Sequence, residues 1–253
     1  MKSTLLKLIS LSKSYEQTSA LRDVSFNIYE GEVVGLIGPN GAGKTSVLRS
    51  IMKYVRPDSG RVIVAGKELA SLKHSELPIS YIPDAPVYYD GLTIEEHLRL
   101  VCMLYGYTEQ ECVLAVKRLS NRLSLEDSLK KVPDKTSRGT QQKMIIACGL
   151  LREYRLLLAD EPFNGLDPEQ IWVLKELLTE CKQQGKSVLV STHLLDLAET
   201  FCDRYILLCQ GSVLASGTKG DIMHEHRLGA ENSMSLEGVF LHLVRARRET
   251  ASC

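Results

Sequence analysis

The chain has 253 residues, of which 44% are hydrophobic and 25% are charged, a composition that suits one large folded α/β domain and argues against disorder. Lys plus Arg and Asp plus Glu both number 31, so the formal net charge at pH 7 is zero. Nucleic-acid-binding proteins usually carry a basic excess or stripe, and we therefore expect no nucleic-acid partner.

The first segment, MKSTLLKLISLSKSY, resembles a signal peptide only superficially. Lys7 interrupts its apolar stretch and no small-residue cleavage site follows, which favours a β-strand. The longest clear apolar run, Met144 to Leu151, is far shorter than the roughly 20 residues that a membrane-spanning helix needs. We expect a chain that is soluble by itself and reaches a membrane only through a separate partner. The scattered cysteines, without a CxxC pair, indicate free thiols in a reducing cytosol: Cys102, Cys112, Cys148, Cys181, Cys202, Cys209 and Cys253.

The next segment, GPNGAGKT, matches the phosphate-binding pattern G-x-x-x-x-G-K-[ST]. It follows a strand-like run (Val33 to Ile37) and opens a helix-like run (Ser46 to Met52), which is the context that the pattern requires. Glycines let backbone N–H groups turn inward around phosphate oxygens, Lys44 reaches the terminal phosphates, and the Thr45 hydroxyl can ligate Mg²⁺. A chance glycine turn is the disfavoured alternative. The predicted nucleotide-binding residues of this loop are Gly38, Pro39, Asn40, Gly41, Ala42, Gly43, Lys44, Thr45 and Ser46.

Helical periodicity begins at Thr93. Thr93 and Glu96 match a capping box, and charged, helical sequence continues to about Lys131, where Pro133 breaks it. A second helix is expected from Pro168 to about Gln184, with Asp167 as its N-cap and Gly185 after its end. The segment YILLCQGSVLAS predicts a closing hairpin around Gln210 and Gly211. Strands that alternate with such helices imply a mostly parallel sheet covered on both faces.

Two apolar, strand-like runs end in polar residues. RLLLADEP ends in Asp160 and Glu161, which can face one pocket where the chain turns. There, Asp160 can hold the Mg²⁺ shell and Glu161 can orient or deprotonate a water molecule, although surface acids in a turn are the alternative. SVLVSTH ends in His193. Because parallel strands end on the rim that holds the phosphates, we favour a γ-phosphate contact over a structural or merely exposed histidine.

In their order and spacing, these segments resemble the ATP-binding cassette (ABC) ATPases over nearly the whole chain. The resemblance implies ATP as the nucleotide and Mg²⁺ as its ion. The matching positions are Tyr15 for the aromatic that stacks on adenine, Gly38 to Thr45 for the Walker A loop, Asp160 and Glu161 for the Walker B pair, Asp167 within NGLDP for the D-loop, and His193 for the switch histidine.

The segment TSRGTQQK, Thr136 to Lys143, occupies the position of the family's signature motif, usually LSGGQ. In the family this loop faces the ATP of another subunit, because two cassettes pack head to tail. An ordinary helix-start loop is the alternative. The resemblance implies contacts to the partner's nucleotide, with the following helix directing its N-terminus at γ-phosphate, from Ser137, Arg138, Gly139 and Gln141.

Two positions depart from the family's pattern. Arg138 replaces the first signature glycine, and Asp84 stands where the family usually has the Q-loop glutamine. The site already holds two acids, and a third carboxylate is tolerable only near a metal. We therefore interpret Asp84 as a contact to Mg²⁺ or its water, together with Thr45 and Asp160.

The resemblance also implies the architecture. We expect a P-loop NTPase (RecA-like) α/β core with a mostly parallel sheet, an antiparallel β subdomain, and a helical insertion subdomain at roughly residues 87–152. The nucleotide-binding domain would span residues 1–225 and a C-terminal helical tail residues 226–253. For this tail, an amphipathic helix docked on its own domain is preferred over a membrane or partner contact. Its apolar face comprises Leu236, Val239, Phe240 and Leu243, followed by Arg245, Arg247 and Arg248.

The resulting hypothesis is an ATPase subunit that powers a separate integral membrane permease through ATP-driven, head-to-tail dimerisation with a second cassette, identical or not. The segments YIPDAPVYYDGLTIEEHL and SLEGVFLHL are most similar to ATPase subunits of bacterial exporters, including the Ecs type. The implied location is cytoplasmic, peripheral on the inner face of the membrane. The alternative is a soluble cassette ATPase that acts on nucleic acid or ribosomes without a membrane partner. Members of that class typically carry a second cassette, coiled-coil arms or zinc insertions, and this sequence shows none of them. A P-loop kinase or GTPase explains neither the signature loop nor His193.

Overall fold

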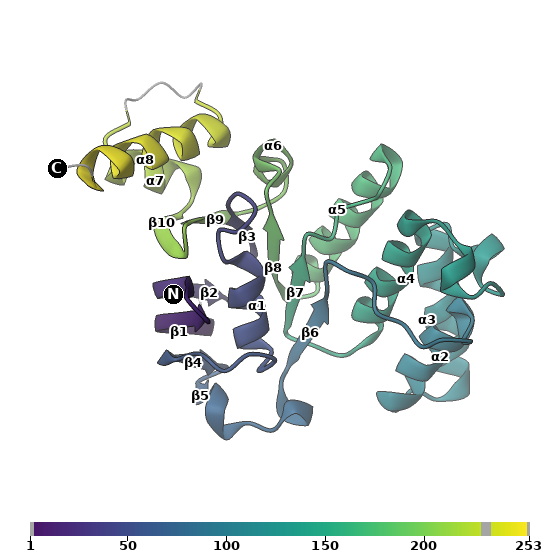
Figure 1. Ribbon diagram of the computed structural model, residues 1–253. Coiled ribbons are helices and arrows are strands. Elements are labelled where there is room, and N and C mark those ends of the chain that lie inside the picture. The colour runs from purple at the N-terminus through teal and green to yellow at the C-terminus, as the bar shows by residue number, and fades with distance from the viewer. Residues whose placement is uncertain (1–2, 229–233, 252–253) are drawn as a thin grey trace.

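The computed structural model describes residues 3–228 and 234–251, without the side chains of residues 248, 250 and 251. Within the described residues, the strands form a central six-stranded sheet, ordered β10-β9-β3-β8-β7-β6, and a four-stranded sheet, ordered β2-β1-β4-β5 (Figure 1). The strands are β1 (Thr4–Tyr15), β2 (Thr18–Tyr29), β3 (Val33–Ile37), β4 (Ser59–Val64), β5 (Lys67–Glu68), β6 (Ile79–Ile82), β7 (Leu156–Asp160), β8 (Ser187–Thr192), β9 (Arg204–Cys209) and β10 (Ser212–Gly217). The α-helices are α1 (Lys44–Ile51), α2 (Ile94–Leu104), α3 (Glu109–Arg122), α4 (Arg138–Leu151), α5 (Pro168–Gln183), α6 (Leu195–Glu199), α7 (Lys219–Glu225) and α8 (Leu236–Ala251). Short 3₁₀ helices lie at Leu69–Ser71, His74–Glu76, Glu126–Ser128 and Pro133–Lys135.

The central sheet is parallel except at one edge. β3 runs parallel to β8 and β9, and β7 runs parallel to β6 and β8. At the edge, β10 pairs antiparallel with β9 through a tight turn at Gln210 and Gly211, whose φ angles are 48° and 78°. Positive φ at both turn residues suits a two-residue hairpin. The strands of the second sheet pair antiparallel, so the predicted fold class is confirmed.

Both faces of the central sheet are covered, which explains its continuous apolar runs. Every residue of β3, β7 and β8 is buried. Alternate side chains join different cores: Leu158 packs with β1, β2 and α1, whereas Leu157 packs with α4 and α5. Val47, Leu48 and Ile51 of α1 belong to the same core as side chains of both sheets. The helix that follows the glycine loop is therefore held from two sides.

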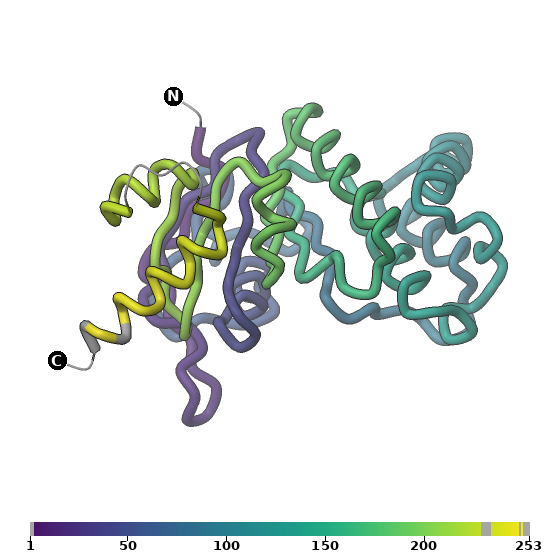
Figure 2. The backbone as a smooth tube through the Cα atoms, turned by 90° about the horizontal axis from the view of Figure 1, so that it is seen from above, coloured from purple at the N-terminus to yellow at the C-terminus, as the bar shows by residue number. Residues whose placement is uncertain are grey.

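The helices α2, α3 and α4 lie between β6 and β7 in sequence and form one end of the molecule (Figure 2). α2 begins at the predicted capping box: Glu96 N donates to Thr93 Oγ1 over 3.3 Å, and Thr93 N donates to Glu96 Oε2 over 2.7 Å. The prediction of continuous helical sequence to about Lys131 is wrong in detail. Gly106 adopts a φ of 75° between α2 and α3, and α3 ends at Arg122. The spacing of apolar residues continues across Gly106, because the helices on both sides bury apolar residues. The spacing therefore does not reveal that the chain changes direction there.

The C-terminal helix α8 lies at the other end of the molecule, next to α7 (Figure 2). Its apolar residues are buried against Ala198 of α6, Tyr205 of β9 and Ile222 of α7. The prediction that this face docks on its own chain is therefore confirmed for Leu236, Val239, Phe240 and Leu243. The side chain of Arg248 and the predicted tail residues 229–233 and 252–253 lie outside the described residues.

Two further sequence predictions concern cysteines and membrane spans. The cysteines that the structure describes are free, as predicted, and Cys253 lies outside the described residues. No described helix combines the length and the apolar character that crossing a membrane requires.

The carboxylate of Glu199, at the end of α6, fastens α8 to the rest of the chain. Its Oε2 accepts a hydrogen bond of 2.8 Å from the backbone N–H of Leu236, the first residue of α8. Its Oε1 accepts from Lys219 Nζ over 2.5 Å, and that ammonium also donates to the carbonyl of Met234 over 3.1 Å. Burial opposes ionisation of Glu199, but the bonds from Lys219 and Leu236 outweigh it and hold its pKa below the usual value.

We expect Glu199→Gln to lower the free energy of unfolding by about 1 kcal/mol near pH 7, because the amide loses the charge that favours both bonds. The folded pKa of Glu199 lies below the unfolded value of about 4.3, so the carboxylate stabilises the fold above that pH. This contribution is lost as the pH falls through the folded pKa. Urea unfolding curves of the two proteins should therefore converge under acidic conditions.

A matched control is Glu237→Gln, because Glu237 lies in the first turn of the same helix and is exposed. It should change stability by less than about 0.5 kcal/mol. A stability difference for Glu199→Gln that stays constant from neutral to acidic pH would show that the charge of Glu199 does not fasten α8.

Candidate functional site

A cleft of about 510 Å³ opens at the carboxyl ends of β3, β7 and β8. Most of the residues singled out from the sequence lie around it, although they come from five separate parts of the chain. The Ser137 to Gln141 loop and Asp167 are not among its lining residues. The lining comprises Tyr15, Thr18, Ser19 and Ala20 of the β1–β2 hairpin, Asn40 to Ser46 of the glycine loop and α1, Asp84, Glu161 with Asn164, and His193.

The glycine loop between β3 and α1 is shaped by a close approach of the backbone to the β1–β2 hairpin. Gly43 adopts a φ of 105°, and a Cβ atom there would lie 2.6 Å from the carbonyl oxygen of Ala20. Gly41 has a φ of 78°, but a Cβ atom there would meet no atom within 4 Å. Gly43 is thus required both by its φ angle and by space, whereas Gly41 is required by its φ angle alone.

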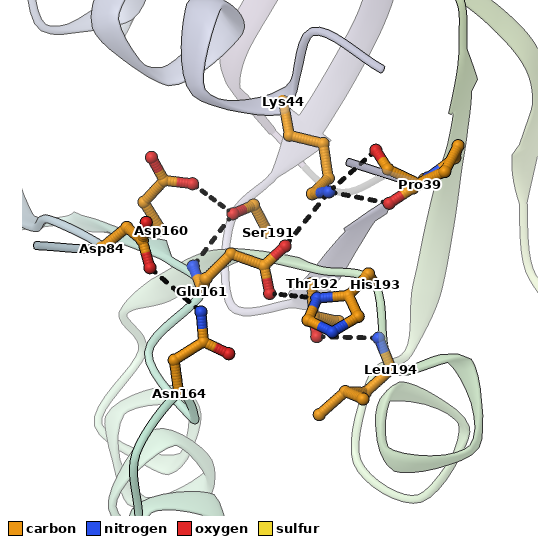
Figure 3. A network of polar contacts seen from close by, with 11 residues as sticks. Pro39, Lys44, Asp84, Asp160, Glu161, Asn164, Ser191, Thr192, His193 and Leu194 are labelled. Atoms are coloured by element: carbon orange, nitrogen blue, oxygen red, sulfur yellow. Dashed lines mark hydrogen bonds and ion pairs between the residues drawn. The ribbon is translucent and has the colours of Figure 1, made fainter. Parts of the chain in front are cut away.

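Lys44 is the buried cation of the site, with only 6% of its surface exposed. Its ammonium donates to the carbonyl oxygens of Gly38, over 2.7 Å, and Pro39, over 3.3 Å (Figure 3). It also forms an ion pair of 3.1 Å with Oε1 of Glu161. Within the described residues that oxygen is buried and accepts no hydrogen bond of good geometry, so the ion pair is its only polar compensation. The glycine-loop carbonyls and the Glu161 carboxylate therefore hold the ammonium of Lys44 in place.

The chain turns between the adjacent acids Asp160 and Glu161: Glu161 lines the cleft, and Asp160 lies buried next to Thr45. Asp160 ends β7 and is fully buried, and Glu161 adopts a left-handed φ of 46°. Side chains of consecutive strand residues point to opposite faces, so this turn is needed to bring the second carboxylate to the cleft. Glu161 lines the cleft and Asp160 is not among its lining residues, so the prediction that both acids face one pocket stays a prediction, as do their roles.

Ser191 joins the two acids, a contact that the sequence did not reveal. Its hydroxyl donates to Asp160 Oδ1 over 2.5 Å and accepts from the backbone N–H of Glu161 over 3.0 Å (Figure 3). β7 and β8 are in register so that Asp160 pairs with Ser191. The signal that could have found Ser191 is its place two residues before His193, one step from the end of a parallel strand.

His193 completes the row of polar groups. Its Nδ1 lies 2.9 Å from Oε2 of Glu161, opposite the oxygen that meets Lys44. Glu161 therefore contacts Lys44 through one carboxylate oxygen and His193 through the other, which gives a continuous row of polar contacts along the cleft. The imidazole side chain is 39% exposed, so its other face is open to a ligand in the cleft.

Asp84 and Tyr15 lie at the margins of the cleft. Asp84 accepts a hydrogen bond of 3.0 Å from Asn164 Nδ2, and it is close enough to Asp160 to disfavour ionisation there. Tyr15 is 41% exposed, and the ammonium of Lys13 lies 5.7 Å from the centre of its ring. A ring in this position can stack on a planar base. The metal contact of Asp84 and the adenine contact of Tyr15 stay predictions.

The predicted signature residues lie at the start of α4. Ser137 is the N-cap, and its hydroxyl accepts from the backbone N–H of Thr140 over 3.2 Å. Gln141 Nε2 donates to the carbonyl of Pro133 over 3.0 Å, which fastens the helix to the preceding 3₁₀ turn. Arg138 and Ser137 are exposed. The N-terminus of α4 is thus built like an anion site but does not line the cleft of its own chain.

Asp167 has a local structural role in the described chain. It is the N-cap of α5, and its Oδ1 accepts from the backbone N–H of Gln170 over 2.8 Å. Pro168 occupies the first turn and Gly185 follows the helix with a φ of 78°, as the sequence predicted. A contact of Asp167 to a second chain stays a prediction.

The donor set of the cleft fits Mg²⁺. Thr45, Asp160 and Asp84 offer only oxygen atoms, which this ion prefers. Burial raises the pKa of Asp160, whereas hydrogen bonds from Ser191 and Thr45 lower it, so a cation beside this carboxylate would relieve a real cost. Within the described residues, no group of three or more His, Cys, Asp or Glu side chains could hold a metal alone.

The comparisons with known proteins agree with this geometry. A family model described as ABC transporter matches residues 21–164, more than half of the chain. The "ABC-type transporter ATP-binding protein EcsA" of Bacillus subtilis (strain 168) is 37% identical over 96% of this chain and 97% of its own length. A solved "ATP binding subunit of ABC transporter" superposes with a TM-score of 0.87 at 39% identity, covering 95% of this chain and 99% of its own. A dimeric, post-hydrolysis structure of the ATP-binding cassette MJ0796, bound to ADP and Pi, gives a TM-score of 0.75 at 28% identity and covers 85% of this chain and 98% of its own.

We expect Gly43→Ala to abolish nucleotide binding and to lower the melting temperature more than Gly41→Ala. Both substitutions place a Cβ on a left-handed residue, which costs about 1–2 kcal/mol. Only Gly43→Ala also forces a methyl group against the carbonyl of Ala20. Thermal unfolding and binding of a fluorescent ATP analogue check this. Equal losses for the two variants would show that the hairpin does not constrain the loop.

Proposed function

The chain belongs to the ABC transporter family as an ATP-binding ATPase, and on this premise we propose that two such cassettes close head to tail over ATP to drive a membrane permease. One observation carries the proposal: Lys44, Glu161 and His193 line one cleft, while the signature loop does not line it. The N-terminus of α4 and its cap Ser137 do not line the cleft of their own chain. A second chain must supply the other half.

In each cleft, the loop backbone and Lys44 would bind the phosphates of ATP. Tyr15 would stack on the base, since its ring is exposed at the cleft margin. A bound Mg²⁺ supplies charge neutralisation at the phosphate oxygens. Thr45, Asp160 and Asp84 would hold that ion, because they offer only oxygen ligands and Asp160 lies close to both of the others.

Glu161 would orient the attacking water and accept its proton. Its Oε2 contacts His193 and its backbone N–H is fixed by Ser191, so the carboxylate is positioned from two sides. When ATP phosphates replace Glu161 as the partner of Lys44, Oε1 becomes available for a water molecule. His193 would contact the γ-phosphate through its exposed ring face.

Across the interface, Ser137, Gly139 and the start of α4 would contact the γ-phosphate in the partner's cleft, beside Arg138 and Gln141. A helix N-terminus binds anions through free N–H groups and a favourable dipole. Asp167 would lie at the same interface, because it begins α5 directly after the cleft residues Glu161 and Asn164.

We further propose that the permease is a separate integral membrane chain and that this chain is a cytoplasmic protein held at the inner face of the membrane by it. EcsA, a relative that matches nearly the whole chain, is described as an ABC-type transporter ATP-binding protein, which supports a bacterial transporter subunit. Residues 1–225 would act as the nucleotide-binding domain and residues 226–253 as a tail. No comparison favours a cassette that acts on nucleic acid, and the net charge of zero gives no reason for one.

We expect Glu161→Gln to bind Mg-ATP but to hydrolyse it about 10² to 10⁴ times more slowly, because a positioned base contributes that much. The amide also removes the negative partner of Lys44, so nucleotide affinity should not fall. Single-turnover hydrolysis and ATP-dependent dimerisation in sizing experiments measure both effects. Exposed Glu153→Gln is the control and should hydrolyse ATP at the wild-type rate. Wild-type turnover in Glu161→Gln would remove this residue from the chemistry.

The head-to-tail dimer is tested by mixing two inactive chains. Ser137→Asp keeps an N-cap acceptor for α4 but sets a carboxylate against the partner's γ-phosphate. Lys44→Ala removes the cation of the cleft. A mixed dimer holds one site in which the cleft and the opposing signature are both intact, so ATPase activity should return on mixing. Ser137→Thr, which keeps a hydroxyl and a cap, is the control that should stay active.

ATP-dependent crosslinking between subunits should be followed in the same mixtures. Crosslinked mixed dimers without any ATPase activity would contradict the assignment of the signature to the partner's site. So would Ser137→Asp chains that hydrolyse ATP normally at a dilution where no dimer forms.

A further inference from the structure

Asp84 and Asn164 come from distant parts of the sequence and meet in the cleft (Figure 3). Asp84 follows β6, where the chain leaves the sheet toward α2, and Asn164 lies in the turn between β7 and α5. The side-chain amide of Asn164 donates to Asp84 Oδ1 over 3.0 Å. Both side chains are half-buried, and within residues 3–228 and 234–251 this is the only hydrogen bond to the Asp84 carboxylate.

The polarity of this bond is fixed by the aspartate. A carboxylate only accepts hydrogen bonds, so Asn164 must present its NH₂ group and cannot turn its oxygen toward Asp84. A bond between an amide and an ionised carboxylate is also about twice as strong as one between neutral groups. The carboxylate at position 84 therefore fixes the orientation of Asn164.

Asn164 cannot move without its neighbours, because it lies inside a tight turn. Its backbone N–H donates to the carbonyl of Glu161 over 3.1 Å, and Leu166 N donates to the carbonyl of Phe163 over 3.3 Å. Gly165, the next residue, has a φ of 77°. The side chain of Asn164 and the carbonyl of Gly165 therefore belong to one short turn whose backbone is held by these hydrogen bonds.

The carbonyl of Gly165 lies directly against the signature loop. A Cβ atom added at Gly139 would lie 2.7 Å from the oxygen of Gly165, closer than real Cβ atoms approach. A Cβ atom added at Gly165 would lie 3.7 Å from Cγ of Arg138. Gly139 thus has no room for a side chain because the turn that carries Asn164 packs beneath the first turn of α4.

We propose that the hydrogen bond from Asn164 to Asp84 positions the signature loop, and that Asn164 is a positioning residue for the partner's nucleotide. The proposal rests on the head-to-tail dimer proposed above. One end of this series of contacts, Asp84, lines the cleft of its own chain, and the other end, Gly139, is next but one to Ser137. The two nucleotide sites of a dimer are thereby connected through two short segments of a single chain.

The first test truncates the donor. In a Glu161→Gln background, which retains bound ATP, Asn164→Ala should weaken ATP-driven dimerisation at least about tenfold, as expected for loss of a charge-assisted bond. Binding of a fluorescent ATP analogue to the dilute monomer should change less than about threefold, because the glycine loop and Lys44 are untouched. Dimerisation is measured by analytical ultracentrifugation, and thermal unfolding verifies that each variant is folded.

The second test reverses the pair. Asn164→Asp sets two carboxylates against each other and should weaken dimerisation more than Asn164→Ala. The double variant Asp84→Asn/Asn164→Asp restores a bond between an amide and a carboxylate and keeps the charge of the cleft, so it should dimerise better than Asn164→Asp alone. Asp90→Asn, at an exposed position of the same connection, controls for loss of charge and should match the parent.

The outcomes separate this inference from the proposed function. A parent that binds ATP but never dimerises would overturn the head-to-tail dimer and this inference with it. A parent that dimerises, together with an Asn164→Ala variant that dimerises equally well, would overturn only the positioning role of Asn164. A double variant as impaired as Asn164→Asp would show that the two side chains act separately, which also overturns it.

Discussion

The site depends on one constraint: β3, β7 and β8 run parallel and end at the same edge of the sheet. Their register places Ile37 beside Thr192 and Asp160 beside Ser191. The glycine loop, the two acids and the histidine therefore emerge next to one another. Because every residue of these strands is buried, a slip of one residue would turn apolar side chains toward the wrong core. Core packing, more than any contact within the cleft, fixes the geometry of the polar groups.

The same edge concentrates charge in a place where water is scarce. Lys44 and Glu161 are both buried, and burying an ion is costly unless it is paired. In the chain alone the two residues compensate each other, and the backbone of the loop supplies two further acceptors for Lys44. A polyanionic ligand offers Lys44 a stronger partner than Glu161. Binding of a polyanion at Lys44 and release of the Glu161 carboxylate are therefore linked, because the ligand and the carboxylate compete for the same ammonium.

The sequence was most informative where backbone geometry restricts residue type. The glycine loop, the hairpin turn at Gln210 and the helix caps at Thr93 and Asp167 could be placed because positive φ angles and unpaired N–H groups demand particular residues. The break at Gly106 was missed, since apolar periodicity continues across it. Contacts that depend on register between distant segments were not accessible: Ser191 with Asp160 and Asn164 with Asp84 lie 31 and 80 residues apart. For such pairs a local pattern can indicate one partner, as the place of Ser191 before His193 does, but it does not reveal the contact.

The loop from Thr136 to Met144 shows why a segment with few charged side chains can form an interface. Only Arg138 and Lys143 among its residues carry a charge, and neither lines the cleft of its own chain. What the loop contributes is the absence of a side chain at Gly139, a hydroxyl cap at Ser137 and the free N–H groups of a helix start. Such groups bind an anion only if a phosphate is brought to them at the correct distance. Because the glycine loop of the same chain lies elsewhere, these features have a use only when a second cassette presents its nucleotide. The packing of Gly165 against Gly139 then decides how accurately that surface is held.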